Sequence, residues 1–408
     1  MKRATGIAGA MSLVVFLTLS ACGSSSLANR TTPGTSPSAT GSAPLGATPP
    51  PSGSLMVLVI RKTNANPPTS TIEIIDSRGH LNASTDFSAP GRPFMSGCVG
   101  LPPPSVRVAA GAVFFADSIG RIHRLEASGA VTQVASFPIT SNQFLSFAVS
   151  PDGQKLIAIL FGTPPVINPM PPFGVDPYVA TGHWTLDLET AITGGATTKV
   201  LHRDFGHTYP STGPTLIAGW DDAGPVATLN SYMCLQSSIP SVEYTNGSLI
   251  HLGSDGTHLD VIGGAGCQPW DELHDGTTIC GGADWQSFTV RTRAGTQLWS
   301  GNVGRFVLEP RLSPNGDGVS VNGDVVQVYL RDSGQPASFA RELAVKPYIL
   351  GWVGSDYVLA LKGGSLLGLV PVADMSNFIG LGLSLQTACA DCDPTPVSLA
   401  GTLGVAAT

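Results

Sequence analysis

The sequence predicts an all-β protein built from repeated antiparallel hairpins. Only 12% of its 408 residues are charged, which is about half the share usual for a soluble domain. The chain also contains 49 glycines and 33 prolines, a composition that disfavours helices and suits short strands joined by turns. Two recurring sequence motifs, a hairpin and a turn-and-strand unit that precedes it, support the same conclusion.

The hairpin motif is a strand of alternating apolar residues with a turn glycine seven residues after its first apolar position. Clear copies pair Ile72 with Gly79, Ile122 with Gly129, Leu249 with Gly256 and Phe288 with Gly295. Looser copies follow Trp184, Val326 and Leu366. A glycine between two alternating runs is typical of a tight turn that needs a positive φ. The motif therefore predicts seven hairpins.

A second turn-and-strand unit precedes the hairpins. Copies cover residues 147–160, 217–229, 268–280, 310–321 and 349–361, with a shortened copy at 106–116. We align them on one position, which stands about six residues before the next strand. That position is held by Ser150, Trp220, Trp270, Ser313 and Trp352. Because the tryptophans recur with the repeat, we expect them in the core.

Seven units of four strands each match the blades of a β-propeller. The turn Ser150-Pro151-Asp152-Gly153 before an apolar strand resembles the repeats of TolB-like and WD-type propellers. The resemblance spans residues 55–405 and implies a scaffold, not an activity. Six or eight blades, or a pair of β-sandwiches, are the alternatives. Residues 55–60 supply one strand where two are expected, so we expect residues 397–403 to provide the missing innermost strand and close the ring.

The N-terminus has the pattern of a bacterial secretion signal. Lys2 and Arg3 precede an uncharged apolar stretch, Ile7 to Leu19, which is shorter than the roughly 20 residues of a membrane-spanning helix. The following Leu19-Ser20-Ala21-Cys22 resembles the lipobox of bacterial lipoproteins. The resemblance implies that the signal is removed before Cys22, and that this cysteine carries the acyl chains that anchor the protein.

The resemblance divides the chain into three segments. Residues 1–21 are expected to be a signal peptide, residues 22–54 a disordered tether of Ser, Thr, Pro and Gly behind the lipid-modified Cys22, and residues 55–408 the propeller. No later apolar run is long enough to cross a membrane. We therefore expect a lipid anchor in the cell membrane, with the propeller on the extracytoplasmic side.

With Cys22 committed to lipid, six cysteines remain, and we expect them to form disulfides in an oxidising compartment. Fifteen pairings are possible for six cysteines. A metal site at Cys389 and Cys392 is the less favoured alternative, since no second pair has the same spacing. The six candidates are Cys98, Cys234, Cys267, Cys280, Cys389 and Cys392.

The charge of the chain excludes one class of partner. The formal net charge is -7, and loss of Lys2 and Arg3 makes the mature chain about two units more negative. Without a basic run the chain has no electrostatic footprint for nucleic acid. We therefore expect no nucleic-acid partner.

Long segments accumulate at one end of the predicted sheets. If the strands of each blade are named A to D, the B–C and D–A connections lie on one face of the propeller and the short A–B and C–D turns on the other. The long segments 89–104, 161–182, 203–214, 230–247, 263–269 and 386–396 are all of the first kind. They carry aromatic residues, methionines and a histidine, which predict a binding face. Its candidate residues are Phe94, Met170, Phe173, Tyr178, His207, Tyr209, Tyr232 and Tyr244.

Catalytic motifs are weak, and no cofactor is expected. There is no nucleophile elbow, no His-Glu-x-x-His and no phosphate-binding loop. Two polar clusters, His202 to His207 and Asp271 to Asp275, can hold a metal or move a proton, as can the turn at Asn315 for calcium. Loop residues of these types are more often solvated. Function is therefore expected to be binding of an envelope protein, peptide or glycan, without catalysis. A propeller hydrolase or lyase with a site at the mouth of the central funnel is the alternative.

Overall fold

The protein is a seven-bladed β-propeller, which confirms the fold class predicted from the repeats. A computed structural model describes residues 53–61, 69–91, 105–163, 182–207, 215–228, 248–282, 286–304, 307–323, 326–331, 338–342, 348–363, 365–384 and 397–403. All of them belong to one compact unit, residues 41–408. The described chain forms seven separate four-stranded antiparallel sheets. Within it, no helix is long and apolar enough to cross a membrane.

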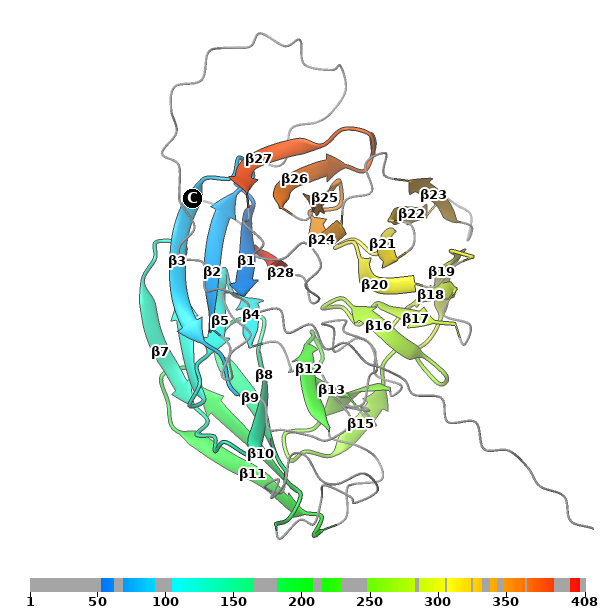
Figure 1. The fold of residues 1–408 in the computed structure, drawn as a ribbon. Helices are drawn as coiled ribbons and strands as arrows, with labels where there is room; N and C mark the ends of the chain where they lie inside the picture. The colour runs from blue at the N-terminus through cyan, green and yellow to red at the C-terminus, as the bar shows by residue number, and fades with distance from the viewer. Residues whose placement is uncertain are drawn as a thin grey trace, which may run out of the picture. The chain divides into compact units, whose positions relative to one another are not determined.

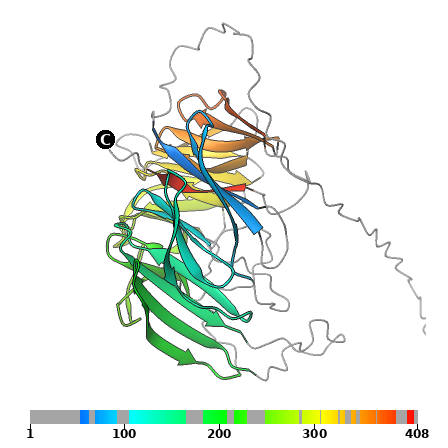
Figure 2. The ribbon, with the colours of Figure 1, turned by 90° about the vertical axis from the view of Figure 1, so that its left-hand side faces the viewer.

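Each sheet is one blade, whose first strand lies nearest the centre of the ring (Figure 1). Blade 1 consists of β28 (Val397–Leu403), β1 (Leu55–Arg61), β2 (Thr69–Asp76) and β3 (Leu81–Ser88). Blade 2 consists of β4 (Val106–Ala109), β5 (Ala112–Ala116), β6 (Arg121–Leu125) and β7 (Val131–Ser136). Blade 3 consists of β8 (Gln143–Val149), β9 (Lys155–Gly162), β10 (Thr185–Ile192) and β11 (Thr197–Asp204). Figure 2 views these three blades from the side, with β28 in red and the other strands in blue to green.

Blade 4 consists of β12 (Leu216–Trp220), β13 (Pro225–Thr228), β14 (Leu249–Leu252) and β15 (His258–Val261). Blade 5 consists of β16 (Gln268–Glu272), β17 (Thr278–Gly281), β18 (Ser287–Arg291) and β19 (Gln297–Asn302). Blade 6 consists of β20 (Val307–Leu312), β21 (Gly318–Gly323), β22 (Gln327–Arg331) and β23 (Ser338–Glu342). Blade 7 consists of β24 (Tyr348–Val353), β25 (Tyr357–Lys362), β26 (Leu366–Pro371) and β27 (Ile379–Ser384).

The ring is closed by the C-terminal strand, as the sequence predicted. Strand β28 pairs antiparallel with β1, so that Leu55 faces Leu403 and Ile60 faces Val397. The pairing joins the two ends of the described chain in one sheet. It also covers the edge that β1 would otherwise leave open.

The turn glycines of the hairpin motif have a second role besides permitting the turn. Gly79, Gly129, Gly256 and Gly295 all have positive φ, between 80° and 91°. In blade 1 a Cβ at Gly79 would collide with the carbonyl oxygen of Leu381 on β27, in blade 7. In blade 4 a Cβ at Gly256 would lie 3.1 Å from Leu201 on β11. In blades 1 and 4 the hairpin tip therefore packs on the outermost strand of the preceding blade, whereas Gly295 of blade 5 meets Gly263 and Gly264 in the connection from blade 4.

The alignment of the turn-and-strand units that precede the hairpins is correct for four blades and wrong for blade 5. Strands β9, β13, β21 and β25 each begin five residues after the aligned Ser or Trp, whereas β17 begins eight residues after Trp270. Ser150 and Ser313 begin their turns, and each backbone N–H donates across the turn to Lys155 or Gly318. In blade 5 it is Leu273 that makes this bond, to the carbonyl of Thr277. Trp270 lies three residues earlier, where the register between β16 and β17 shifts. Blades 4 and 7 have the same shift, between Ile217 and Gly219 and between Ile349 and Gly351. Trp270 therefore stands at the bulge itself, two residues before the position that corresponds to Trp220 and Trp352.

The core is made of apolar clusters between neighbouring blades. Blades 2 and 3, for example, are joined through Phe114 on β5 and Phe147 on β8, and both side chains are fully buried. Trp270 and Trp299 of blade 5 pack on blade 6 in the same way. Trp270 and Trp352 lie in the core as predicted, and Trp184 and Trp299 are buried as well. Trp220 is only partly buried and packs against the cluster between blades 3 and 4.

Candidate functional site

The predicted binding face falls mostly outside the described residues. Seven of its eight candidates lie there: Phe94, Met170, Phe173, Tyr178, Tyr209, Tyr232 and Tyr244. The strands that flank them are described, and their ends fix where each connection starts and finishes. Segments 92–104, 164–181, 208–214, 229–247 and 385–396 each join strand B to C or strand D to the next A. All five therefore leave the sheets at the same end, which we call the long-loop face.

His207, the described member of the binding face, belongs to a small histidine cluster on blade 3. Its ring lies edge-on to the ring of His183, with 4.6 Å between the ring centres. Nδ1 of His207 lies 3.0 Å from the carbonyl oxygen of Gly182, and Nδ1 of His183 lies 2.7 Å from Oδ2 of Asp204. These contacts join the residues that follow segment 164–181 to the residues that precede segment 208–214.

The predicted cluster of His202, Asp204 and His207 is divided in the structure. His202 faces Asp187 across the β10–β11 pair, with 2.6 Å between Nδ1 and Oδ1. Lys199 contacts the same carboxylate at 3.1 Å. His202 is thus held by ion pairs on the surface of the sheet. The described residues contain no group of three His, Cys, Asp or Glu side chains placed to hold a metal.

One boundary between blades differs in character from the other six. Six apolar clusters each combine residues of two neighbouring blades, whereas the cluster at Val226, Leu249 and Ile262 draws on blade 4 and its exit alone. The innermost strands also lie against one another at every other boundary, but β12 and β16 make no comparable contact within the described chain. We call the boundary between blades 4 and 5 the polar seam.

The polar seam contains a chain of four charged side chains. His251 on β14 is fully buried, with Nε2 2.7 Å from Oδ2 of Asp221 and Nδ1 2.7 Å from Oδ1 of Asp260. Arg293, from the outer hairpin of blade 5, donates to the same Oδ2 of Asp221 at 2.9 Å. His251 thus lies between two carboxylates, and Asp221 lies between two basic side chains.

Asp221 is the centre of this chain. Its Oδ1 accepts hydrogen bonds from the backbone N–H groups of Ala223 and Gly224, which shapes the A–B turn of blade 4. Beside it, the N–H of Asp222 donates to the carbonyl of His274 in the A–B turn of blade 5. The two turns and one outer hairpin thereby hold the blades together at the end of the sheets opposite the long-loop face.

Glu272, at the end of β16, is a further acidic side chain in the seam. Its Oε1 is buried and finds no hydrogen-bond partner within the described part of the chain. Burial raises the pKa of this carboxyl well above its usual range, and the negative charges of Asp221 and Asp271 raise it further. Arg293 opposes the shift. With Asp275 included, three acids and one base therefore act on Glu272.

Asp271 has a structural partner in the next blade. Its Oδ2 accepts a 2.7 Å hydrogen bond from the backbone N–H of Leu312 on β20. Burial raises the pKa of Asp271 to about 7, although this bond and one from Glu272 lower it. The predicted cluster at 271–275 is thus split, because His274 and Asp275 lie exposed in the turn. Oδ1 of Asp275 accepts from the backbone of Thr277.

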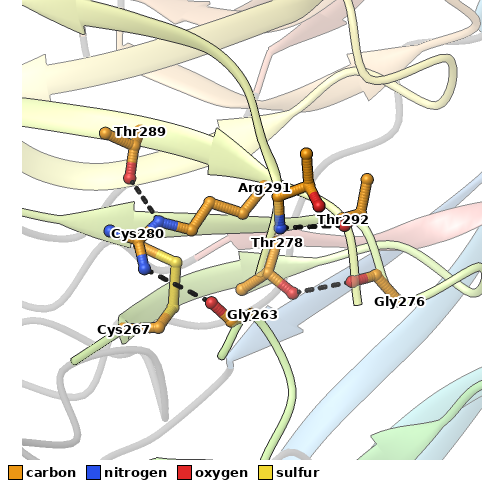
Figure 3. Close-up of a disulfide and its surroundings, with 9 residues drawn as sticks. Gly263, Cys267, Gly276, Thr278, Cys280, Thr289, Arg291 and Thr292 are labelled. Atoms are coloured by element: carbon orange, nitrogen blue, oxygen red, sulfur yellow. Dashed lines mark hydrogen bonds between the residues drawn. A yellow bond between two sulfur atoms is a disulfide. The ribbon is translucent and has the colours of Figure 1, made fainter. Parts of the chain in front are cut away.

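A disulfide lies beside the seam, within blade 5. Cys267 and Cys280 are bonded and join the start of β16 to the end of β17 (Figure 3). Arg291 approaches the carbonyl of Gly263, in the connection from blade 4, at 3.4 Å, and bonds the hydroxyl of Thr289 at 3.1 Å. The other cysteines, Cys98, Cys234, Cys389 and Cys392, lie outside the described residues.

Sequence reasoning missed four residues of the seam: Asp221, His251, Asp260 and Arg293. His251 left a visible signal, because it interrupts the apolar strand Leu249–Leu252 with a side chain that has to be buried. Arg293 left none, since a turn arginine is ordinarily solvated. Their convergence depends on the packing of two blades, which no local pattern encodes.

Comparison with known proteins adds no function to these sites. The sequence matches no protein-family model and no curated protein. An oligogalacturonate lyase in complex with manganese is 10% identical, with 83% of this chain and 99% of that chain covered and a TM-score of 0.42. The C-terminal WD40 domain of Sif2 is 12% identical over 70% and 74% of the chains, with a TM-score of 0.38. The dehydrogenase NirN in complex with DHE is 12% identical over 84% and 75%, with a TM-score of 0.41. Similarity at this level does not extend to activity.

Proposed function

We propose that this protein is a lipid-anchored propeller on the extracytoplasmic side of the cell membrane, which binds an envelope protein, peptide or glycan without catalysis. The observation that carries the proposal is the distribution of the connections. Five long segments leave the sheets on the long-loop face, while the opposite face has tight turns such as those at Gly79 and Gly153. Long connections on a rigid scaffold are where binding residues are usually found.

The Cys267–Cys280 disulfide supports the proposed location. Disulfides persist in oxidising compartments outside the cytoplasm. The anchor itself is proposed from the residues around Cys22, where a thiol follows Leu19-Ser20-Ala21 directly behind an apolar stretch. Acyl chains stabilise membrane binding by about 0.8 kcal/mol per buried methylene, so two or more chains hold the protein firmly.

A binding function is favoured over the hydrolase or lyase alternative because the buried acidic side chains hydrogen-bond to other groups of the protein. A funnel enzyme should bring acids and histidines of several blades within hydrogen-bond reach of one point. Among the described residues, Asp221 and His251 bond each other, and Asp271 bonds the backbone of Leu312. These groups serve the joints between neighbouring blades.

The binding proposal is tested by capture with the mature protein. One variant replaces residues 164–181 by a short Gly-Ser linker between Thr163 and Gly182, and a matched control changes Ile192→Ser at the other end of blade 3, where the side chain is 67% exposed. Both should fold. We expect the linker variant to lose its partner from solubilised membranes or cell-wall fragments, and the control to keep it. Identical captured material from both variants would contradict the proposal.

The anchor is tested separately by Cys22→Ser. This variant should leave the membrane fraction for the soluble extracytoplasmic fraction, with the propeller still folded. Ser25→Ala, three residues further along, serves as the control and should stay on the membrane. Continued membrane association of Cys22→Ser would contradict lipid anchoring through this cysteine.

A further inference from the structure

Among the described residues, the polar seam is the one joint of the ring without an apolar cluster shared by both blades. At the other six boundaries, apolar side chains of both blades are buried together, and such burial does not depend on pH. At the seam, the described contacts between blades 4 and 5 are the Arg293–Asp221 ion pair, the approach of Arg291 to the carbonyl of Gly263, and two backbone bonds, from Asp222 to the carbonyl of His274 and from Gly263 to the carbonyl of Arg293. Part of its strength therefore depends on charge.

Glu272 lies beside the chain of Asp260, His251, Asp221 and Arg293, in which each acid already contacts a basic side chain. The charged groups that act on Glu272 come from every element around it: Asp221 from the A–B turn of blade 4, Asp271 from β16, Asp275 from the A–B turn of blade 5 and Arg293 from the outer hairpin of blade 5. Three of these four are acids.

Ionisation of Glu272 would place a further negative charge in the seam. Its buried Oε1 has no donor within the described chain to stabilise that charge, and a buried carboxylate without partners is strongly unfavourable. Water supplies the missing hydrogen bonds once the blades separate at this end. Separation and ionisation of Glu272 thus favour each other.

We propose that the polar seam is a proton-operated joint of the ring, closed while Glu272 carries a proton and loosened when it ionises. Blade 5 itself stays intact, because the Cys267–Cys280 disulfide ties β16 to β17. Blade 4 keeps its apolar contact with blade 3 through Ile217 and Ile250. The opening is therefore confined to one boundary out of seven. This inference is independent of the proposed partner.

The test is hydrogen exchange of the mature protein between about pH 5 and about pH 8, corrected for the intrinsic pH dependence of exchange. In the wild type, segments from β12, β14 and β16 should lose protection as the pH rises, by up to tenfold per unit once Glu272 ionises. Segments from β5 and β9, at the apolar boundary of blades 2 and 3, should not change.

Two variants complete the test. Both are made in an Asp271→Asn background, because burial raises the pKa of Asp271 to about 7 and this carboxyl would titrate in the same range. In that background Glu272→Gln keeps the shape of the protonated acid, so it should fold, and the pH dependence at the seam should disappear. Glu126→Gln alters a glutamate that pairs with Arg124 at the surface of blade 2, and it should behave like the Asp271→Asn parent. The proposal is overturned if Glu272→Gln retains the pH dependence, if the change spreads evenly over all boundaries, or if Glu272→Gln does not fold.

Discussion

Arg293 of blade 5 reaches across a blade boundary to Asp221 of blade 4, with 2.9 Å between the guanidinium nitrogen and Oδ2. Its side chain passes over Gly276, where an added Cβ would lie 2.6 Å from Nε of Arg293. A turn glycine of blade 5 thus leaves room for the contact. At this boundary, hydrogen-bonded charges replace the apolar packing that joins the other blades.

Asp221→Ala should be among the most destabilising single substitutions in the ring. It leaves His251 buried with one carboxylate instead of two and removes the partner of Arg293. Breaking a buried ion pair typically costs about 3–5 kcal/mol, which urea unfolding will measure as a lower midpoint. Asp222→Ala, at the exposed neighbouring position, should change the midpoint little. Equal losses in the two variants would mean that the seam is not held by Asp221.

Asp271 should make the stability of the protein depend on pH. Its pKa of about 7 in the folded chain lies above the usual value, so the folded state binds the proton more tightly than the unfolded state does. The contribution is fully present below about pH 4 and declines as the pH rises to about 7, by up to about 1.4 kcal/mol per unit. Asp271→Asn should remove this part of the slope in urea unfolding measured across that range, whereas Asp222→Asn should not. An unchanged slope in Asp271→Asn would rule out the assignment.

Gly79→Ala should cost more than Gly194→Ala, although both glycines have nearly the same positive φ, 82° and 78°. A left-handed conformation costs a residue with a Cβ about 1–2 kcal/mol, and this term is common to both variants. At Gly194 an added Cβ meets nothing within 4 Å, whereas at Gly79 it meets the backbone of Leu381 in blade 7. The difference between the two melting temperatures therefore reports the contact between hairpin tip and preceding blade. Equal melting temperatures would show that the backbone of Leu381 accommodates the added Cβ without a loss of stability.

Removal of residues 393–408 should abolish cooperative unfolding, because it removes β28 from blade 1. Strand β28 contributes Val397 to the cluster with Leu58 of blade 1 and Leu359 of blade 7. Without it, β1 exposes an unpaired edge and this boundary loses part of its core. A control that removes only residues 404–408, beyond β28, should unfold like the full chain. A cooperative transition in the longer truncation would show that closure by β28 is dispensable.

The scaffold could be predicted from the sequence because its signals are local. Turn glycines such as Gly129 and the alternating residues around Ile122 specify each hairpin within about ten residues. Closure by residues 397–403 followed from counting strands. The polar seam could not be predicted, since it arises where Asp221, His251 and Arg293 meet from two blades. The disulfide partner of Cys267 was equally open, because pairing depends on which strands become neighbours.

The central claim, that the long-loop face is the binding face, is tested most directly by photocrosslinking in intact cells. A photoreactive residue at position 207 lies at this face, and one at position 196 lies at the exposed opposite end of the same blade. We predict a discrete crosslink to an envelope component from position 207 and none from position 196. Crosslinks from position 196 alone, or none from either position, would contradict the claim.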